Sequence, residues 1–262
     1  MAKKVAEQLV DTLIEAGVRR IYAVTGDSLN EVNEAVRQNE AMKWIHVRHE
    51  ETGAYAAGAE AQLTGLPGCC AGSSGPGHVH LINGLYDAHR SGAPVIAIAS
   101  TIPTGEFGTE YFQETNTVKL FNDCSFYNEV ATTPEQFPRM LQSALQTATI
   151  RKGVAVVGLP GDLAKKPAVK VESSEQIYPL ASSVCPAEED LIRLAGMLNH
   201  YERITLFCGI GCKGAHEEII RMSETLNAPV AYTFKGKMEV QYDNPYEVGM
   251  TGLLGMPSGY YS

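Results

Sequence analysis

The chain has 262 residues, of which 44% are hydrophobic and 19% are charged, so its composition is that of a folded globular protein rather than a disordered one. Its formal net charge of -9 argues against a nucleic-acid-binding surface, because phosphate contacts need clustered Lys and Arg. The N-terminus shows no signal-peptide core, and the longest apolar runs are far shorter than the ~20 residues that cross a bilayer. We therefore expect a cytoplasmic protein.

Apolar strands alternate with amphipathic helices along the first 160 residues. The pattern predicts helices at 5–16, 29–38, 51–63, 80–89 and 134–148, and strands at 21–24, 44–47, 69–72, 95–99 and 154–159. This order is typical of an α/β fold with a parallel sheet covered on both faces. Ligands of such sheets bind at the carboxyl ends of the strands, which draws attention to the strand exits at Gly26, Gly75 and Thr101–Gly108.

Pro160–Pro186 contains four prolines and no clear period, and we interpret it as an inter-domain linker. It separates a first domain, residues 1–182, from a second, residues 183–262. The second begins a new α/β unit, with helices predicted at 187–198 and 215–226 and strands at 204–208 and 230–232. Two strands and two helices make a poor independent core, so we expect this domain to be incomplete.

Three polar or Gly-rich segments have the residue types of a functional site. Arg48-His49-Glu50-Glu51 places a carboxylate where a strand meets an Ala-rich helix, although acidic residues also cap helices. Ser74-Gly75-Pro76-Gly77 lets backbone approach a ligand closely, although a tight turn needs the same residues. Tyr111-Phe112-Gln113-Glu114 lies in a long connection, and such loops are often functional. Each signal alone is weak.

Their order and spacing resemble the thiamine-diphosphate-dependent decarboxylases and oxidases, and within them the quinone-linked pyruvate oxidases. The segments that carry the resemblance are 47–51, 75–77, 80–85, 112–114, 242–246 and 249–254. The resemblance covers essentially the whole chain. It implies a thiamine-pyrimidine-binding domain followed by part of a Rossmann-like FAD-binding domain.

The resemblance also implies roles for individual residues. Glu50 would contact the aminopyrimidine ring of the cofactor and promote removal of the proton from its thiazolium carbon. Phe112 and Gln113 match positions near the substrate, and Gly75-Pro76-Gly77 matches a loop near the cofactors. Gly26, His80 and Asn83 are further candidates on this side of the sheet, although a solvated or capping role is an equal alternative for His80 and Asn83. His78 departs from the family, which often has Asn or Gly there, so its role stays open.

For the second domain, the resemblance implies contacts with FAD. Gly209-Ile210-Gly211 follows a strand and precedes a helix, which suits close approach to a dinucleotide, although the motif is incomplete. The segment Thr251-Gly252-Leu253-Leu254 matches family residues that contact the flavin. Cys208 and Cys212 flank the glycines, but a metal site would need more ligands nearby. We expect all six cysteines to be reduced.

The implied activity is oxidative decarboxylation of pyruvate to acetate and CO2, with quinone as the electron acceptor. In the family, Mg2+ and the diphosphate are held by a third domain with a Gly-Asp-Gly motif, which does not occur in this sequence. We therefore expect the chain to be catalytically incomplete alone. The family implies a homo-oligomer, dimer or tetramer, with the active site between subunits, and membrane contact through a C-terminal region.

Two alternatives remain open. Acetolactate synthases share the Glu and the Phe-Gln-Glu segment but typically show Lys-His further on, where this chain has Ser125-Phe126. A non-catalytic module that only dimerises or binds nucleotide is the other alternative. A plain NAD-dependent dehydrogenase is disfavoured, because no G-x-G-x-x-G follows the first strand.

Overall fold

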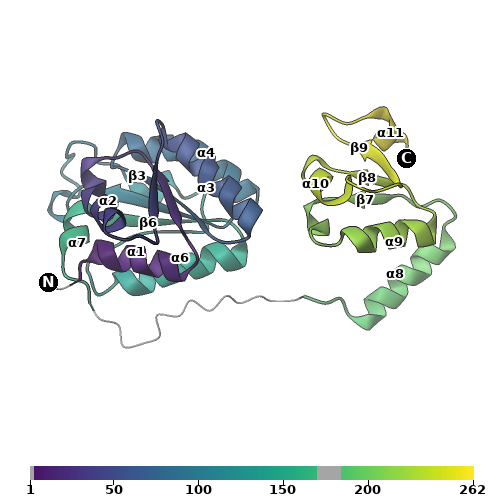
Figure 1. Cartoon of the computed structure of the whole chain (residues 1–262), viewed down its shortest axis with the longest axis horizontal. Coiled ribbons are helices and arrows are strands. Elements are labelled where there is room, and N and C mark those ends of the chain that lie inside the picture. Colours follow the sequence, from purple (N-terminus) through teal and green to yellow (C-terminus); the bar gives the residue numbers. More distant parts are fainter. Residues whose placement is uncertain (1–2, 170–183) are drawn as a thin grey trace. The chain divides into compact units, whose positions relative to one another are not determined.

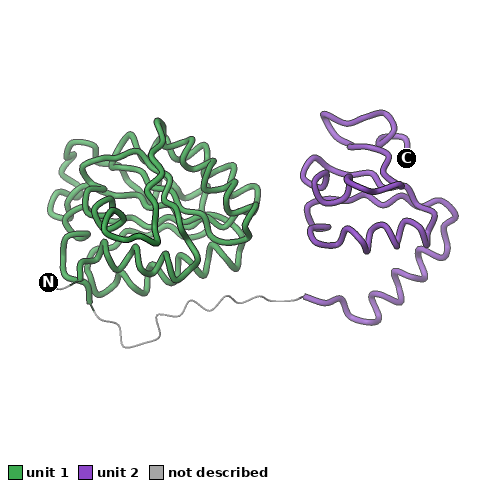
Figure 2. Tube along the Cα trace, in the orientation of Figure 1, with its two compact units in different colours: residues 1–182 green, residues 183–262 purple. Residues whose placement is uncertain are grey.

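The computed structural model describes residues 3–169 and 184–262. The chain forms two compact units, unit 1 with residues 1–182 and unit 2 with residues 183–262 (Figure 2). Within the described residues, none of the helices combines the length and the apolar character that crossing a membrane requires.

Unit 1 is built on a six-stranded sheet in which every neighbouring pair of strands is parallel. The strand order is β2-β1-β3-β4-β6-β5, so the chain reverses its direction of growth between β1 and β3. In open α/β sheets this reversal opens a crevice at the carboxyl ends of the two strands. The strands are β1 (Arg20–Ala23), β2 (Lys43–His46), β3 (Gly68–Gly72), β4 (Val95–Thr101), β5 (Tyr127–Val130) and β6 (Val154–Pro160).

The central strands are buried along their whole length because helices cover both faces of the sheet. Every residue of β3, β4 and β6 is buried. One face packs on α1 (Val5–Glu15), α2 (Asn30–Arg37), α6 (Phe137–Arg151) and α7 (Gly161–Lys165). The other packs on α3 (Glu50–Thr64) and α4 (Pro76–Arg90) (Figure 1). The short α5 (Thr117–Leu120) adds the partly buried Leu120 to this side.

Small residues let α3 and α4 approach each other closely. A Cβ atom at Gly84 would lie 2.6 Å from Cβ of Ala54, and one at Gly58 would lie 3.2 Å from Cβ of Ala88. Larger side chains at the two glycines would force the helices apart. The small residues of both helices therefore allow α3 and α4 to pack closely along their length.

Three expectations for unit 1 need correction. The helix expected from residue 80 begins at Pro76, so Gly75-Pro76-Gly77 is not a loop but the cap and first turn of α4. Strand β5 was not predicted from the sequence. Residues 161–165 of the supposed linker form α7, whose Leu163 and Ala164 are fully buried in the core. The prolines of the predicted linker mask the apolar pattern of this short helix. Residues 170–183 of that linker lie outside the described residues.

Unit 2 holds a three-stranded parallel sheet of order β7-β8-β9. Its strands are β7 (Leu206–Cys208), β8 (Val230–Tyr232) and β9 (Glu247–Met250), and its α-helices are α8 (Glu188–His200), α9 (His216–Leu226), α10 (Lys237–Val240) and α11 (Pro257–Tyr261). The sequence predicted α8, α9 and the first two strands, but not β9, α10 or α11.

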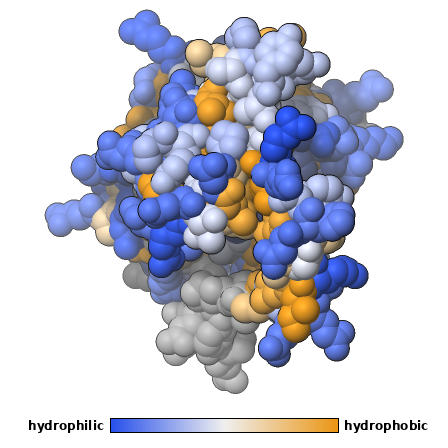
Figure 3. Space-filling view, turned by 90° about the vertical axis from the view of Figure 1, so that its right-hand side faces the viewer, coloured by the Kyte–Doolittle hydropathy of each residue, from blue (hydrophilic) through white to orange (hydrophobic). Residues whose placement is uncertain are grey.

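The buried core of unit 2 is small. It consists of Cys208, Val230, Tyr232 and Val240, with a few partly buried neighbours. Helix α8 has no buried residue, and its Leu191 and Met197 are exposed. Figure 3 shows apolar surface between polar side chains on one face of the molecule. Unit 2 thus buries a smaller share of its apolar side chains than unit 1 does.

Candidate functional site

The carboxyl ends of β1 and β3 meet at the crevice that the strand order predicts. Oγ of Ser28, after β1, lies 3.0 Å from Oγ of Ser73, after β3, and accepts a hydrogen bond of 3.1 Å from the backbone N–H of Ser74. Gly26 packs against this contact, since a Cβ atom there would lie 2.4 Å from Cβ of Ser73. Gly26 is therefore required for the two strand exits to close on each other.

Glu50 is the first residue of α3 and points its carboxylate at the first turns of α4. The preceding residue, His49, caps the helix by accepting the backbone N–H of Glu51 at 3.3 Å. Glu50 is 9% exposed, and its Oε2 lies 2.9 Å from Nδ1 of His80. Its Oε1 faces Gly77, where a Cβ atom would lie 3.3 Å away.

The two carboxylates of this helix end have different surroundings. Glu51 is turned outward, where its Oε1 accepts a 2.6 Å hydrogen bond from the exposed side chain of Asn83. Glu50 points instead into the helix–helix contact. Asn83, a predicted cofactor-binding residue, therefore contacts Glu51, and His80 is the α4 residue that reaches Glu50.

His49, Glu50 and His80 form the one group of metal-ligand side chains found within residues 3–169 and 184–262, with ligand atoms within 4.8 Å of one another. The two imidazole rings stack with centroids 4.3 Å apart. Both Nδ1 atoms already take part in hydrogen bonds, with Glu51 N–H and with Glu50. The group is therefore best described as a hydrogen-bonded cluster around the Glu50 carboxylate.

The connection after β4 brings Gln113 to the start of α4. The Ser74 hydroxyl donates a 2.8 Å hydrogen bond to the backbone oxygen of Gln113. Gly75 adopts φ 72°, and a Cβ atom there would lie 2.9 Å from Cβ of Gln113. Gln113 itself has φ 65°, an unusual value for a residue with a side chain. The neighbouring Phe112 is 79% exposed.

His78 contacts the same connection through Thr115 and also contacts the end of β4. It is fully buried in the first turn of α4, and its Nδ1 lies 2.7 Å from Oγ1 of Thr115. Its Nε2 lies 2.8 Å from the backbone oxygen of Ser100, at the end of β4. Burial lowers the pKa of His78 to about 4, so the ring is neutral at neutral pH. The sequence left this role open, because Thr115 and Ser100 lie far from His78 along the chain.

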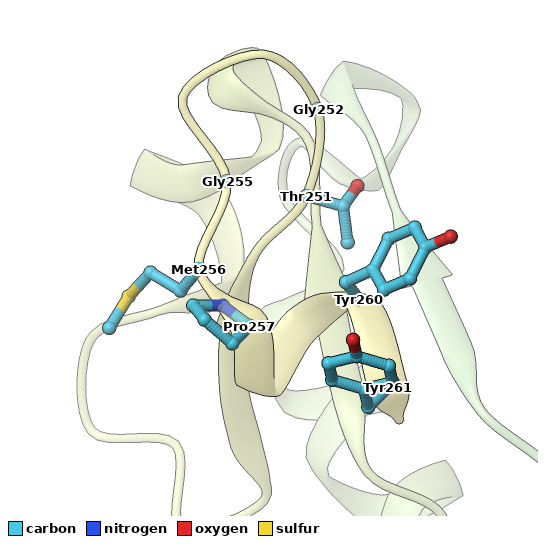
Figure 4. A pocket seen from close by; sticks show the side chains of 7 residues that line it. All are labelled: Thr251, Gly252, Gly255, Met256, Pro257, Tyr260 and Tyr261. Atoms are coloured by element: carbon cyan, nitrogen blue, oxygen red, sulfur yellow. The ribbon is translucent and has the colours of Figure 1, made fainter.

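In unit 2, Thr251 and Gly252 follow β9 and line a pocket of about 300 Å³, together with Gly255, Met256, Pro257, Tyr260 and Tyr261. Figure 4 shows the side chains of Thr251, Tyr260 and Tyr261 beside one another at the foot of the loop. Gly252 has φ 102°, and no atom lies within 4 Å of the position that its Cβ would take. Its backbone is therefore open to a ligand.

The remaining predicted flavin residues do not line this pocket. Leu253 and Leu254 are 103% and 70% exposed. Gly209 and Gly211 follow β7, and Gly211 has no neighbour within 4 Å of its Cβ position. Because the three strands are parallel, the segments after β7 and β9 still share one edge of the sheet.

Comparison with known proteins finds one family match within unit 1 and another within unit 2. The N-terminal TPP-binding domain of the thiamine pyrophosphate enzymes matches residues 3–120, and the central domain of these enzymes matches residues 191–262. The chain is 50% identical over 260 residues to an uncharacterized 42.6 kDa protein in the isoamylase 3' region of Pseudomonas amyloderamosa, an alignment that covers 99% of this chain and 66% of the relative.

Other relatives carry the names of enzymes, among them a pyruvate oxidase and several acetolactate synthases. Pyruvate oxidase of Lactiplantibacillus plantarum is 36% identical over 224 residues, covering 84% of this chain and 37% of that protein. The chloroplastic acetolactate synthase of Arabidopsis thaliana is 29% identical over 266 residues, covering 99% of this chain and 39% of the synthase. The chain thus spans between 37% and 66% of the length of these relatives. It is a member of the thiamine pyrophosphate enzyme family and carries that family's N-terminal thiamine pyrophosphate-binding domain and its central domain.

Proposed function

We propose that the chain forms part of a thiamine-diphosphate- and FAD-dependent enzyme that converts pyruvate to acetate and CO2 and passes the electrons to a quinone. The observation that carries the proposal is the position of Glu50. Its carboxylate is almost buried at the crevice beside β1 and β3, held by His80 through Oε2. The similarity to pyruvate oxidase supports the choice of substrate.

The residues around Glu50 fit the aminopyrimidine end of thiamine diphosphate. Within the described residues, Oε1 of Glu50 accepts no hydrogen bond, so it is available to share a proton with a ring nitrogen. The missing side chain of Gly77 leaves room beside that oxygen. When bound, thiamine diphosphate supplies the electron sink for decarboxylation.

The chain's own residues would orient the reactants and position the proton that Glu50 shares with the cofactor ring. His80 holds the Glu50 carboxylate in place, so that Oε1 keeps its direction toward the ring. Gln113, held against Gly75 by Ser74, would border the substrate, and exposed Phe112 would cover it. The diphosphate and Mg2+ would be held by a further domain, and the active site would be completed by a second subunit.

We propose that the pocket of unit 2 binds one end of FAD. Its volume of about 300 Å³ is at the lower end of the range for small-molecule sites, which suits one ring system rather than a whole dinucleotide. Tyr260 and Tyr261 provide aromatic surface for such a ring, and Gly252 offers open backbone. Gly209 and Gly211 would approach the phosphates from the same sheet edge.

A second candidate is an acetolactate synthase-like carboligase. It is favoured because the similarity to the acetolactate synthase of Arabidopsis thaliana extends over 99% of this chain. The positions of Ser125 and Phe126 favour the oxidase. Ser125 donates a hydrogen bond to the backbone oxygen of Phe121 at 2.8 Å, and the Phe126 ring packs between His89 and Arg151. Both residues are thus committed to packing, where the synthases typically carry a Lys-His pair.

The test is pyruvate-dependent reduction of bound flavin, followed by absorbance in the full-length protein with thiamine diphosphate and Mg2+. We expect the wild-type flavin to bleach and Glu50→Gln to be slower by about 10²–10⁴-fold, the usual contribution of a positioned acid or base. Glu51→Gln is the matched control, because Glu51 faces outward, and it should retain the wild-type rate. A flavin that stays oxidised with pyruvate would reject the oxidase, and acetolactate formation would then be measured. Loss of both activities would leave a binding module.

A further inference from the structure

Cys208 and Cys212 are brought together by the glycine turn that follows β7. Cys208 ends the strand and is buried, whereas Cys212 ends the 3-10 turn Ile210–Cys212 and is half-buried. The backbone N–H of Cys212 donates a 3.1 Å hydrogen bond to the oxygen of Gly209, which folds the turn back on itself. Cys208 belongs to the small buried core of unit 2, Cys212 packs against that core, and the neighbouring Cys212 helps to raise the pKa of Cys208.

We propose that Cys208 and Cys212 are a reversible thiol–disulfide site that small disulfides of the glutathione type oxidise. The backbone between the cysteines offers little resistance to the adjustment that a sulfur–sulfur bond needs. Gly211 has no atom within 4 Å of its Cβ position, and the nearest neighbour of Gly209 is Oγ1 of Thr233 at 3.8 Å. The bond would close a short ring around the turn at the carboxyl edge of the unit 2 sheet.

The two sulfurs have different parts in the reaction. Burial, together with the neighbouring Cys212, raises the pKa of Cys208 to about 12, so Cys208 remains a protonated thiol at neutral pH. Cys212 is more accessible and meets the oxidant first. Its thiolate attacks a sulfur of oxidised glutathione, forming a mixed disulfide and releasing one glutathione thiolate. Cys208 then gives up its proton, and its sulfur attacks Cys212 and releases the second glutathione.

The cysteines of unit 1 provide internal controls. Cys69 and Cys70 are adjacent in β3, but their side chains enter the cores on opposite faces of the sheet, so they cannot bond to each other. Both are fully buried, and burial raises the pKa of each thiol. Cys124 is also buried in unit 1. These three thiols should stay reduced under conditions that oxidise the pair.

The experiment exposes the full chain to glutathione buffers of increasing oxidised-to-reduced ratio, in a Cys185→Ser background that removes the exposed cysteine. After acid quenching and alkylation, intact mass and peptide mapping identify the products. We expect the loss of two thiols and two hydrogen atoms in one step, with a cross-linked peptide containing Cys208 and Cys212, reversed by reduced glutathione. Cys208→Ser should instead hold one glutathione on Cys212.

Two results would overturn the proposal. Wild-type protein that gains one glutathione at Cys212 without a cross-link would show that the buried sulfur cannot complete the exchange. Protein that keeps both thiols in fully oxidised glutathione would show that the pair is inert. Because both readings come from peptides of the wild-type sequence at these positions, they do not depend on whether the serine variant folds.

Discussion

Nδ1 of His80, in the second turn of α4, lies 2.9 Å from Oε2 of Glu50, the first residue of α3. This contact joins the two helix ends that border the crevice of the sheet. It leaves Oε1 as the oxygen that faces the open side of the site, next to Gly77. His80 is therefore a positioning residue for the carboxylate on which the proposed chemistry depends.

Removing this contact should slow the reaction without unfolding the protein. A hydrogen bond to a charged group contributes about 1.5–3 kcal/mol, so His80→Ala should lower kcat by about 10–100-fold. His80→Gln keeps an N–H donor and should recover part of that loss. Asn83→Ala is the control, because it breaks only the exposed contact with Glu51. Equal losses in His80→Ala and Asn83→Ala would contradict a specific role for His80.

His78 should make unit 1 sensitive to acid. The unfolded chain takes up a proton near the ordinary His pKa of 6.5, whereas burial holds the folded pKa at about 4. Stability from this group is therefore fully present above pH 6.5 and is lost as the pH falls from 6.5 toward 4, by about 3 kcal/mol in total. His78→Asn should remove this dependence.

The measurement uses urea unfolding followed by fluorescence of Trp44, the single tryptophan, which lies in β2 of unit 1. It therefore reports on the unit that contains His78. The expected result is a free energy of unfolding that falls more steeply with acid in wild type than in His78→Asn. Parallel pH profiles for the two proteins would show that His78 is not the titrating group.

Gly75 should tolerate no side chain. Its φ of 72° lies in the left-handed region, and a Cβ atom would come within 2.9 Å of Cβ of Gln113. Gly75→Ala should destabilise unit 1 by about 1–3 kcal/mol and displace Gln113 from the start of α4. Gly105→Ala, at an exposed position with no atom within 4 Å of the added carbon, should change stability little. Trp44 fluorescence in urea compares the two, and equal stabilities would refute the prediction.

Leu253 and Leu254 allow flavin binding to be separated from folding. Both side chains are largely exposed, so their replacement removes no packing from the core of unit 2. Leu253→Ser combined with Leu254→Ser should leave thermal unfolding unchanged. It should weaken FAD binding by at least about 10-fold, because less apolar surface would be buried against the flavin. Titration of the apoprotein with FAD, followed by flavin fluorescence, measures the affinity. Unchanged affinity would remove both leucines from the proposed site.

Local sequence patterns were sufficient for most elements and for the family. Apolar runs such as 95–99 and 154–159 predicted β4 and β6, because a central parallel strand is apolar on both faces. The resemblance around Glu50 led to the thiamine pyrophosphate family, which the domain comparisons support. Strand β5, with its mixed burial, and the short helix α7 escaped prediction because neither has a long apolar period.

Contacts between distant segments could be found only in the folded chain. The pairings of Glu50 with His80, of His78 with Thr115, and of Ser74 with Gln113 join residues that are 30 to 39 positions apart. Which side chain of α4 reaches Glu50 depends on how closely and at what rotation α3 and α4 pack, and the glycines at the helix contact set that distance. Local propensity carries no record of such packing, so the sequence could not decide between His80 and Asn83, and only the folded chain shows that His80 contacts Glu50 while Asn83 contacts Glu51.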